Sequence, residues 1–210
     1  MTFLYIILSV AGSFCLCGMW FGLCVLCSSL LKKCGAAARF APLAASAPFA
    51  AALYFTAGFI PQEHGYAQIL PCGAAALFSA AAAAAIATRG GERRRLFGKE
   101  LFWSIADGAF MEIPQRLFMQ GALFALLSYC AVPNAAVWAI FCNGTVWCLG
   151  IAVQASFAKE RFCKALFAEL CASFIFSAGV GFAYMQSGSV PLCMAAHAAE
   201  RAISNAIAKK

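Results

Sequence analysis

Charged side chains are scarce in this sequence, where they make up 11% of the 210 residues, against about 25% in a typical soluble protein. Apolar residues make up 64%. Apolar runs of the roughly 20 residues needed to span a membrane follow one another along the chain, separated only by short polar breaks. No length of sequence is left for a soluble domain. The composition therefore predicts a single integral membrane domain over residues 1–210, in contact with the lipid bilayer.

The apolar runs predict an all-α, polytopic membrane helix bundle with about seven transmembrane helices. They lie near residues 3–31, 40–60, 67–88, 103–128, 135–156, 165–186 and 190–207. The first run has no basic segment before it and exceeds the roughly 7–15 apolar residues of a signal peptide, so we expect a retained helix.

Small residues within these runs predict where helices approach closely. Gly18 and Gly22 form a G-x-x-x-G pattern, and the third run contains "GAAALFSAAAAAAIA". Small side chains let helix backbones come together in lipid, where no hydrophobic force drives helix association. We therefore expect a helix contact at the glycine pair, and an inner position for the third span.

Basic residues are missing from every second connection. Apart from Arg116 and Arg201, which lie within predicted spans, Lys and Arg occur in "KKCGAAAR", "RGGERRRLFGK" and "AKERFCK" and at the C-terminus. The positive-inside rule then puts the C-terminus in the cytoplasm and the N-terminus outside, and we expect the bacterial cytoplasmic membrane. Because orientation and attraction to anionic lipid explain the net charge of +7, we expect no nucleic-acid partner.

The sequence also lacks a metal-binding pattern. Its twelve cysteines lie almost entirely in apolar runs, where free cysteine behaves as a small hydrophobic residue. Cys24 and Cys27 form a C-x-x-C pair, but no second ligand pair follows at a zinc-site spacing. We therefore expect no metal and no cofactor. Histidine is rare, with only His64 in a connection and His197 in the last span.

Polar side chains nevertheless occur within three predicted spans, where each ionisable residue costs about 2.5–3.5 kcal/mol and usually faces the bundle interior. They are Glu112, Arg116 and Gln120 in the fourth span, Asn143 and Thr145 in the fifth, and His197, Arg201 and Asn205 in the seventh. Residues four apart share a helix face, so the fourth and seventh spans each carry a polar stripe. We expect the stripes to line one cavity.

Pro114 separates Glu112 from Arg116. Because proline has no amide hydrogen, we expect it to free the carbonyl of Phe110 and kink the helix beside this cavity. A simpler interpretation is that the Glu112–Arg116 pair only assists assembly and that His197 is an interior histidine. Three further acidic residues are read as solvated or interfacial: Asp107, Glu169 and Glu200.

Three stretches resemble the motifs of the CAAX-protease and bacteriocin-processing (CPBP) family of intramembrane endopeptidases. That family has Glu-Glu-x-x-x-Arg on one span, Phe-x-x-x-His on the next, and His-x-x-x-Asn or a similar residue on a late span. The corresponding stretches here are "MEIPQR" (Met111 to Arg116), "FCNGT" (Phe141 to Thr145) and "HAAER" (His197 to Arg201). The resemblance implies a CPBP-like core over residues 103–207.

The chain matches these motifs only in part. The matching positions are Glu112, Arg116, Phe141 and His197. The leading glutamate, the second-motif histidine and the polar residue of the last motif are replaced by Met111, Thr145 and Arg201. His64, on a predicted outer loop, cannot substitute for the missing histidine.

The resemblance also implies roles, because in the family a glutamate and a histidine activate water while other polar side chains stabilise the oxyanion. Glu112, kept ionised by Arg116, would be the general base to a water shared with His197. The implied supporting polar groups are Arg116, Asn143, Thr145 and Arg201, with Asn143 or Arg201 as the oxyanion partner. Phe141 is the packing residue of its motif.

These features predict an endopeptidase, or a pseudoenzyme with the same fold, that takes a membrane-associated peptide or protein. We then expect Glu112, Phe141, Thr145 and His197 to surround one cavity in the cytoplasmic half. The alternative is a small transporter or permease component in which the same stripes line a polar path. A structural helper of another membrane complex is a third interpretation.

Overall fold

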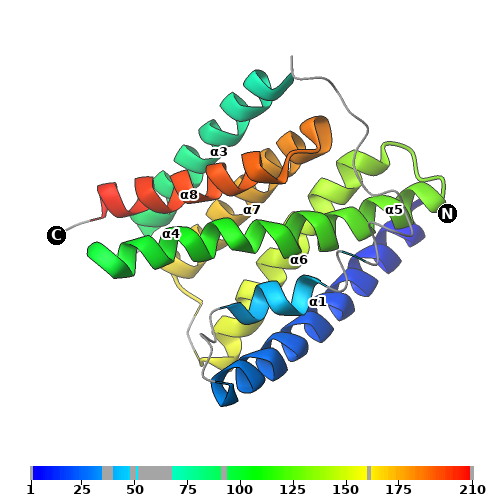
Figure 1. The fold of residues 1–210 in the computed structure, drawn as a ribbon. Helices are drawn as coiled ribbons and strands as arrows, with labels where there is room; N and C mark the ends of the chain where they lie inside the picture. The colour runs from blue at the N-terminus through cyan, green and yellow to red at the C-terminus, as the bar shows by residue number, and fades with distance from the viewer. Residues whose placement is uncertain are drawn as a thin grey trace.

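The computed structural model describes residues 2–34, 40–47, 51, 68–90, 94–159 and 162–208. This part of the chain forms helices joined by short connections, without strands (Figure 1). The helices are α1 (Thr2–Lys33), α3 (Ile69–Gly90), α4 (Gly98–Glu112), the π-helical η3 (Ile113–Gln120), α5 (Gly121–Tyr129), α6 (Ala135–Phe157), α7 (Lys164–Ser187) and α8 (Val190–Ile207). Because α4, η3 and α5 follow one another without a break, they make one long helix.

The helices lie close to the predicted spans. The runs at 3–31, 67–88, 135–156, 165–186 and 190–207 correspond to α1, α3, α6, α7 and α8, and the run at 103–128 lies within the long helix. Of the predicted span at 40–60, residues 40–47 and 51 are described and helical, and the rest lies outside the described residues, as does His64. By length and composition, α1 from Phe3 onward, α3, α6 and α7 are able to cross a membrane.

The long helix α4–η3–α5 runs through the middle of the bundle in Figure 1, with α8 on one side and α6 and α1 on the other. Helix α4 packs against α8, α7 packs against both α3 and α6, and α1 packs against α6 and α5. Segment η3 contacts α6, α7 and α8. This arrangement brings polar side chains from three predicted spans to one place in the interior.

One face of α3 is made of alanine and packs closely against α7 and α8. Its buried alanines are Ala76, Ala80, Ala83, Ala84 and Ala87. The absence of large side chains lets the helix backbones approach, as predicted. Leu70 and Phe78 are exposed on the same helix, so α3 lies at the edge of the bundle and not in the inner position that its alanines suggested.

Helix α1 packs on the bundle through Cys17 and Trp20, both of which are buried. The indole nitrogen of Trp20 donates a hydrogen bond to the hydroxyl of Ser46 over 2.7 Å. A Cβ on Gly18 or Gly22 would meet no atom within 4 Å. Among the described residues, the glycine pair therefore does not form the close helix contact that its spacing predicted.

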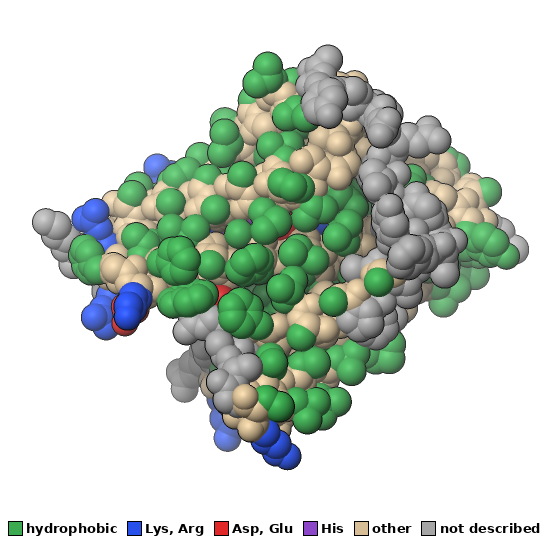
Figure 2. All heavy atoms as spheres, viewed as in Figure 1, with side chains coloured by type: hydrophobic (Ala, Val, Ile, Leu, Met, Phe, Trp, Pro, Cys, Tyr) green, Lys and Arg blue, Asp and Glu red, His purple; other side chains and the backbone are tan. Residues whose placement is uncertain are grey.

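Apolar side chains cover most of the face seen in Figure 2. Lys and Arg gather at its left and lower edges, where α8 ends, α4 begins and α1 ends. An apolar belt with charges at the helix ends is the surface expected of a bundle embedded in lipid. Which side of the membrane the basic ends face remains a prediction.

Candidate active site

The fourth predicted span changes helix type at the polar stripe. Pro114 is the second residue of η3, and the amide of Ile113 donates to the carbonyl of Phe110. The carbonyl of Phe110 is therefore not free, which corrects the expectation drawn from the proline. The wider π-helical turn accommodates the missing amide hydrogen without breaking the helix, and π-helical turns of this kind are frequent at functional sites.

The polar side chains of this stripe are buried, and hydrogen bonds join each one to the next. Glu112, Arg116 and Gln120 are each 0% exposed. Arg116 Nε donates to Glu112 Oε2 over 2.7 Å, and Arg116 Nη1 donates to Gln120 Oε1 over 2.7 Å. Gln120 Nε2 in turn donates to the carbonyl of Gly181 in α7 over 2.9 Å. The guanidinium thus neutralises the carboxylate, and the amide joins the pair to the neighbouring helix.

His197 brings α8 to the same carboxylate. Its Nδ1 lies 2.7 Å from Glu112 Oε1, and its ring packs against Phe176 with centroids 4.6 Å apart and an interplanar angle of 57°. Because an ionised carboxylate only accepts hydrogen bonds, Nδ1 carries the proton in this contact. In the neutral imidazole, Nε2 is then left with its lone pair. The fourth and seventh spans therefore meet at Glu112 and His197.

Helix α6 contributes Asn143 to this interior, and not the motif residues on either side of it. Asn143 is 0% exposed, and its Nδ2 lies 3.5 Å from Gln120 Oε1. The hydroxyl of Thr145 donates to the carbonyl of Phe141 over 2.9 Å, within its own helix. The ring of Phe141 is half exposed and packs on Phe174. The structure therefore does not bring Phe141 and Thr145 to the site, because residues two apart point to different sides of a helix.

The polar residues at the end of α8 are arranged differently from the prediction. Arg201 lies beside Glu200, with 3.4 Å between Nε and Oε2. Glu200 is buried, not interfacial, and accepts a hydrogen bond from the Ser204 hydroxyl over 2.8 Å. Asn205 bonds to both backbone groups of Leu96, with its Oδ1 2.6 Å from the amide nitrogen and its Nδ2 3.2 Å from the carbonyl oxygen. Asn205 thus fixes the segment that leads into α4.

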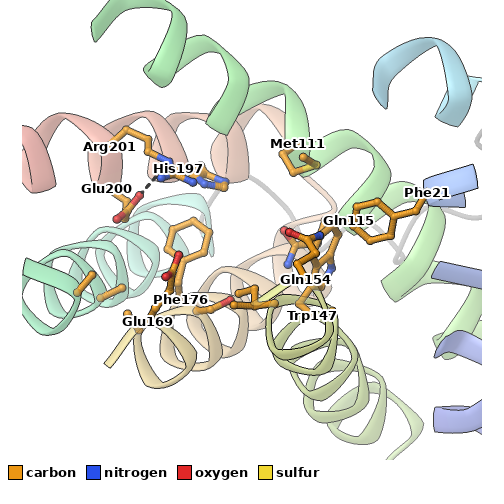
Figure 3. A pocket seen from close by; sticks show the side chains of 16 residues that line it. Phe21, Met111, Gln115, Trp147, Gln154, Glu169, Phe176, His197, Glu200 and Arg201 are labelled. Carbon is orange, nitrogen blue, oxygen red and sulfur yellow. Dashed lines mark ion pairs between the residues drawn. The ribbon is translucent and has the colours of Figure 1, made fainter. Parts of the chain in front are cut away.

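A cavity of about 380 Å³ opens beside His197 (Figure 3). Its lining comes from α1, α3, α4, η3, α6, α7 and α8. In the view of Figure 3, His197, Glu200 and Arg201 lie at one end, and Trp147 and Phe21 lie at the other. The lining residues occur near the ends of α3, α6 and α8 and the start of α7, which adjoin the basic connections. The cavity therefore lies in the half of the bundle that the basic residues predict to be cytoplasmic.

Sequence reasoning missed several residues of this cavity wall. Met111, singled out only as a replaced motif residue, lines it together with Phe21, Trp147 and Gln154. Trp147 lies four residues after Asn143, so helix spacing alone could have placed it on the interior face. Phe21 comes from α1, far from the other lining residues in sequence, and no local pattern connects it to the site.

Within the described ranges, the side chains of His, Cys, Asp and Glu do not gather in groups of three or more that could hold a metal ion. Polar groups of several kinds line the cavity: the amides of Gln115 and Gln154, the carboxylates of Glu169 and Glu200, the Ser173 hydroxyl, the His197 imidazole and the Arg201 guanidinium. The carboxylate of Glu112 lies behind the imidazole and is bonded to it. Such a set can hold and move protons and can stabilise a developing negative charge.

The fold and site together describe a polytopic helical protein with a buried carboxylate–imidazole pair beside a cavity. A family model, type II CAAX prenyl endopeptidase Rce1-like, matches residues 97–203. The chain belongs to this family, which confirms the CPBP resemblance that the motifs carried. The matched segment runs from just before α4 into α8 and includes Glu112, Arg116 and His197. No curated protein and no solved structure matches the chain.

Family membership and the four long apolar helices identify an integral membrane protein of a membrane protease family. The predicted core at 103–207 overlaps the matched segment at 97–203. The identity of the membrane and the direction of insertion stay predictions.

Proposed function

We propose that the protein is an intramembrane endopeptidase that hydrolyses a peptide bond in a membrane-associated peptide or protein. The observation that carries the proposal is the 2.7 Å contact between Glu112 Oε1 and His197 Nδ1 at the wall of a cavity. Glu112 is 0% exposed, whereas the His197 side chain keeps an exposed fraction of 10%. A buried carboxylate that orients a partly exposed imidazole is the arrangement of a general base with its orienting partner.

The contacts favour His197, and not Glu112, as the group that meets water. Both carboxylate oxygens of Glu112 are already engaged, one by Arg116 and one by His197. Its role in this proposal is to orient the imidazole and to stabilise the imidazolium that forms during the reaction. This assignment revises the role that the family resemblance implied for Glu112.

In the proposed reaction, Nε2 of His197 takes a proton from a water as the water oxygen attacks the scissile carbonyl carbon. The carbonyl π electrons move to oxygen and form a tetrahedral oxyanion. Collapse of this intermediate breaks the C–N bond, and the imidazolium returns its proton to the leaving amine. Arg116 offsets the charge of Glu112 in the site throughout this cycle.

Arg201 is the best placed of the implied oxyanion partners. Its side chain lines the cavity and is 38% exposed, so its guanidinium is within reach of a bound substrate. Asn143 is fully buried next to Gln120, and we assign it to holding that amide. Thr145 has no role in this proposal.

The test is a cleavage assay in detergent or vesicles with a library of membrane-associated peptides, with products read by mass spectrometry. We expect cleavage by the wild type, and a loss of about 10²–10⁴-fold with His197→Ala or Glu112→Gln, the range typical of general-base catalysis. Thr145→Val is the control and should leave the rate unchanged, since the Thr145 hydroxyl bonds only to its own helix.

Two results would contradict the proposal. If His197→Ala still cleaved peptides at the wild-type rate, the carboxylate–imidazole pair would not be part of the mechanism. A wild type that cleaves nothing, while a photo-crosslinking peptide labels the cavity, would identify a pseudoenzyme that binds peptides.

A further inference from the structure

Gly108 of α4 lies directly against the catalytic imidazole of the proposed reaction. A Cβ placed on Gly108 would come within 2.9 Å of Cδ2 and 3.2 Å of Nε2 of His197, and within 3.0 Å of Cγ of Arg201. Two carbon atoms pack best at about 3.5–4.0 Å. The edge of the imidazole and the stem of Arg201 therefore occupy the space that any side chain at position 108 would need.

The His197 ring is thus held on three sides by residues of two helices, α4 and α7. Glu112 in α4 binds Nδ1 over 2.7 Å, Phe176 in α7 packs against the ring face at 4.6 Å, and the bare α-carbon of Gly108 supports the edge that carries Nε2. None of these contacts is a hydrogen bond to Nε2. The contact with Glu112 fixes the proton on Nδ1, and the contact with Gly108 fixes where Nε2 lies.

We propose that Gly108 is a positioning residue that keeps His197 in the Nδ1–H tautomer with the Nε2 lone pair free at the cavity. The inference rests on the proposed role of His197 as the general base. A methyl group at position 108 pushes the Cδ2–Nε2 edge away from α4. Because the ring is rigid, this movement also turns Nδ1 away from Glu112. The proton is then no longer held on Nδ1, and the two tautomers can exchange.

The chain suits a direct test, because it contains just two histidines. In a His64→Ala background, [¹⁵N]histidine labels His197 alone. Above the titration range of the imidazole, we expect Nδ1 to show the ¹⁵N shift of a protonated nitrogen and Nε2 that of an unprotonated one. In Gly108→Ala, we expect both shifts to move toward the average of exchanging tautomers.

Gly150→Ala is the matched control. Gly150 is also buried and also lines the cavity, but a Cβ there would meet no atom within 4 Å. This variant should leave both ¹⁵N shifts at their parent values. An unchanged spectrum in Gly108→Ala would overturn the inference, and so would a parent spectrum with the proton on Nε2.

The added methyl also approaches Arg201, which gives Gly108→Ala a second way to disturb the fold that does not involve His197. The double variant Gly108→Ala with Arg201→Ala removes the Cγ contact and keeps the contact with the ring. Its ¹⁵N spectrum is read in the same way. A parent-like pair of shifts in the folded double variant would overturn the inference.

A cleavage assay separates this inference from the proposed function. With a cleaved peptide, Gly108→Ala should lower kcat by about 10²-fold with little change in KM, as for a catalytic group displaced by about 1 Å. If no peptide is cleaved but the ¹⁵N shifts move as expected, the positioning role holds and the proposed function fails. If His197→Ala abolishes cleavage while Gly108→Ala keeps both the wild-type rate and the wild-type shifts, the proposed function holds and the positioning role of Gly108 fails.

Discussion

Met111 lines the cavity with His197 and packs against the apolar cluster of α1 and α6 that contains Trp20 and Val146. It occupies the position at which the family motif has its leading glutamate. A thioether fills space at the cavity wall, but it cannot take a proton from water and accepts hydrogen bonds only weakly. The proposed mechanism therefore depends on His197 and Glu112, without a carboxylate at position 111.

Replacing Met111 by glutamate tests this limit. We expect Met111→Glu to raise kcat by about 10²-fold, because a carboxylate at this position of the cavity wall can share a water with His197. Met111→Gln has the same length without the charge and is the control in the same peptide-cleavage assay. Equal rates for the two variants would show that the position does not limit catalysis.

Arg116 is the residue whose removal should harm stability most. It and Glu112 are both 0% exposed and are 2.7 Å apart, and removing one partner of a buried ion pair leaves an uncompensated charge. We expect Arg116→Met to lower the free energy of unfolding by about 3–5 kcal/mol. Reversible denaturation in mixed micelles measures the change.

The double variant Glu112→Gln with Arg116→Met is the control for this prediction. Because it removes both charges, it should recover a substantial part of the lost stability. A double variant as unstable as the sum of the two single changes would mean that charge pairing is not what these residues contribute.

At the scale of elements, the approach of η3 to α7 depends on Gly181. A Cβ there would lie 3.0 Å from Gln120 Oε1 and 3.2 Å from Arg116 Nη1. Gln120 is bonded to Arg116, and Arg116 is bonded to Glu112, so these side chains cannot move independently. The bare backbone of α7 at Gly181 thus supports the polar chain.

Gly181→Ala should destabilise the fold by about 1–3 kcal/mol through overpacking. It should also lower the cleavage rate, since displacing Arg116 moves Glu112. Thermal unfolding and the peptide assay measure the two effects. Gly150→Ala, whose added methyl meets no atom within 4 Å, is the control for unfolding. If Gly181→Ala kept the wild-type stability and cleavage rate, the backbone of α7 would be able to move away from η3 at this position.

At the scale of the whole molecule, the polar chain does not continue as an open path. It runs from His197 through Glu112, Arg116 and Gln120 to the carbonyl of Gly181. Glu112, Arg116 and Gln120 are each 0% exposed. Because ionisable groups on a solute pathway face a water-filled cavity, we expect this chain of buried groups to belong to a closed site and not to a transport route.

We therefore expect reconstituted vesicles to show no proton or small-solute flux above that of empty vesicles. Glu112→Gln vesicles serve as the matched control. Flux that disappears in the Glu112→Gln vesicles, together with no cleavage of any peptide, would favour the transporter alternative.

The orientation of the bundle is a property of the whole chain. The basic connections predict a cytoplasmic C-terminus. A C-terminal green fluorescent protein fusion in a bacterial host should fluoresce, and a C-terminal alkaline phosphatase fusion should be inactive. Active phosphatase and dark fluorescent protein would reverse the orientation and place the cavity in the outer half of the membrane.

The sequence by itself determined the class of protein, the helix positions and two of the polar stripes. An apolar run of sufficient length forms a helix in lipid because every backbone group must bond within the segment. The spacing of Glu112 from Arg116, and of His197 from Arg201, puts each pair on one helix face by local geometry alone. The family motifs added the expectation that the stripes meet.

Only the tertiary structure decided which face of each helix turns inward. Rotation of a helix about its axis is set by packing against its neighbours, and no local pattern specifies it. That rotation buries Asn143 and directs Thr145 away, buries Glu200, and brings Phe21 and Met111 to one cavity. The 2.7 Å contact that joins Glu112 to His197 depends on α4 meeting α8 at a glycine, and it links two residues that are 85 positions apart in the chain.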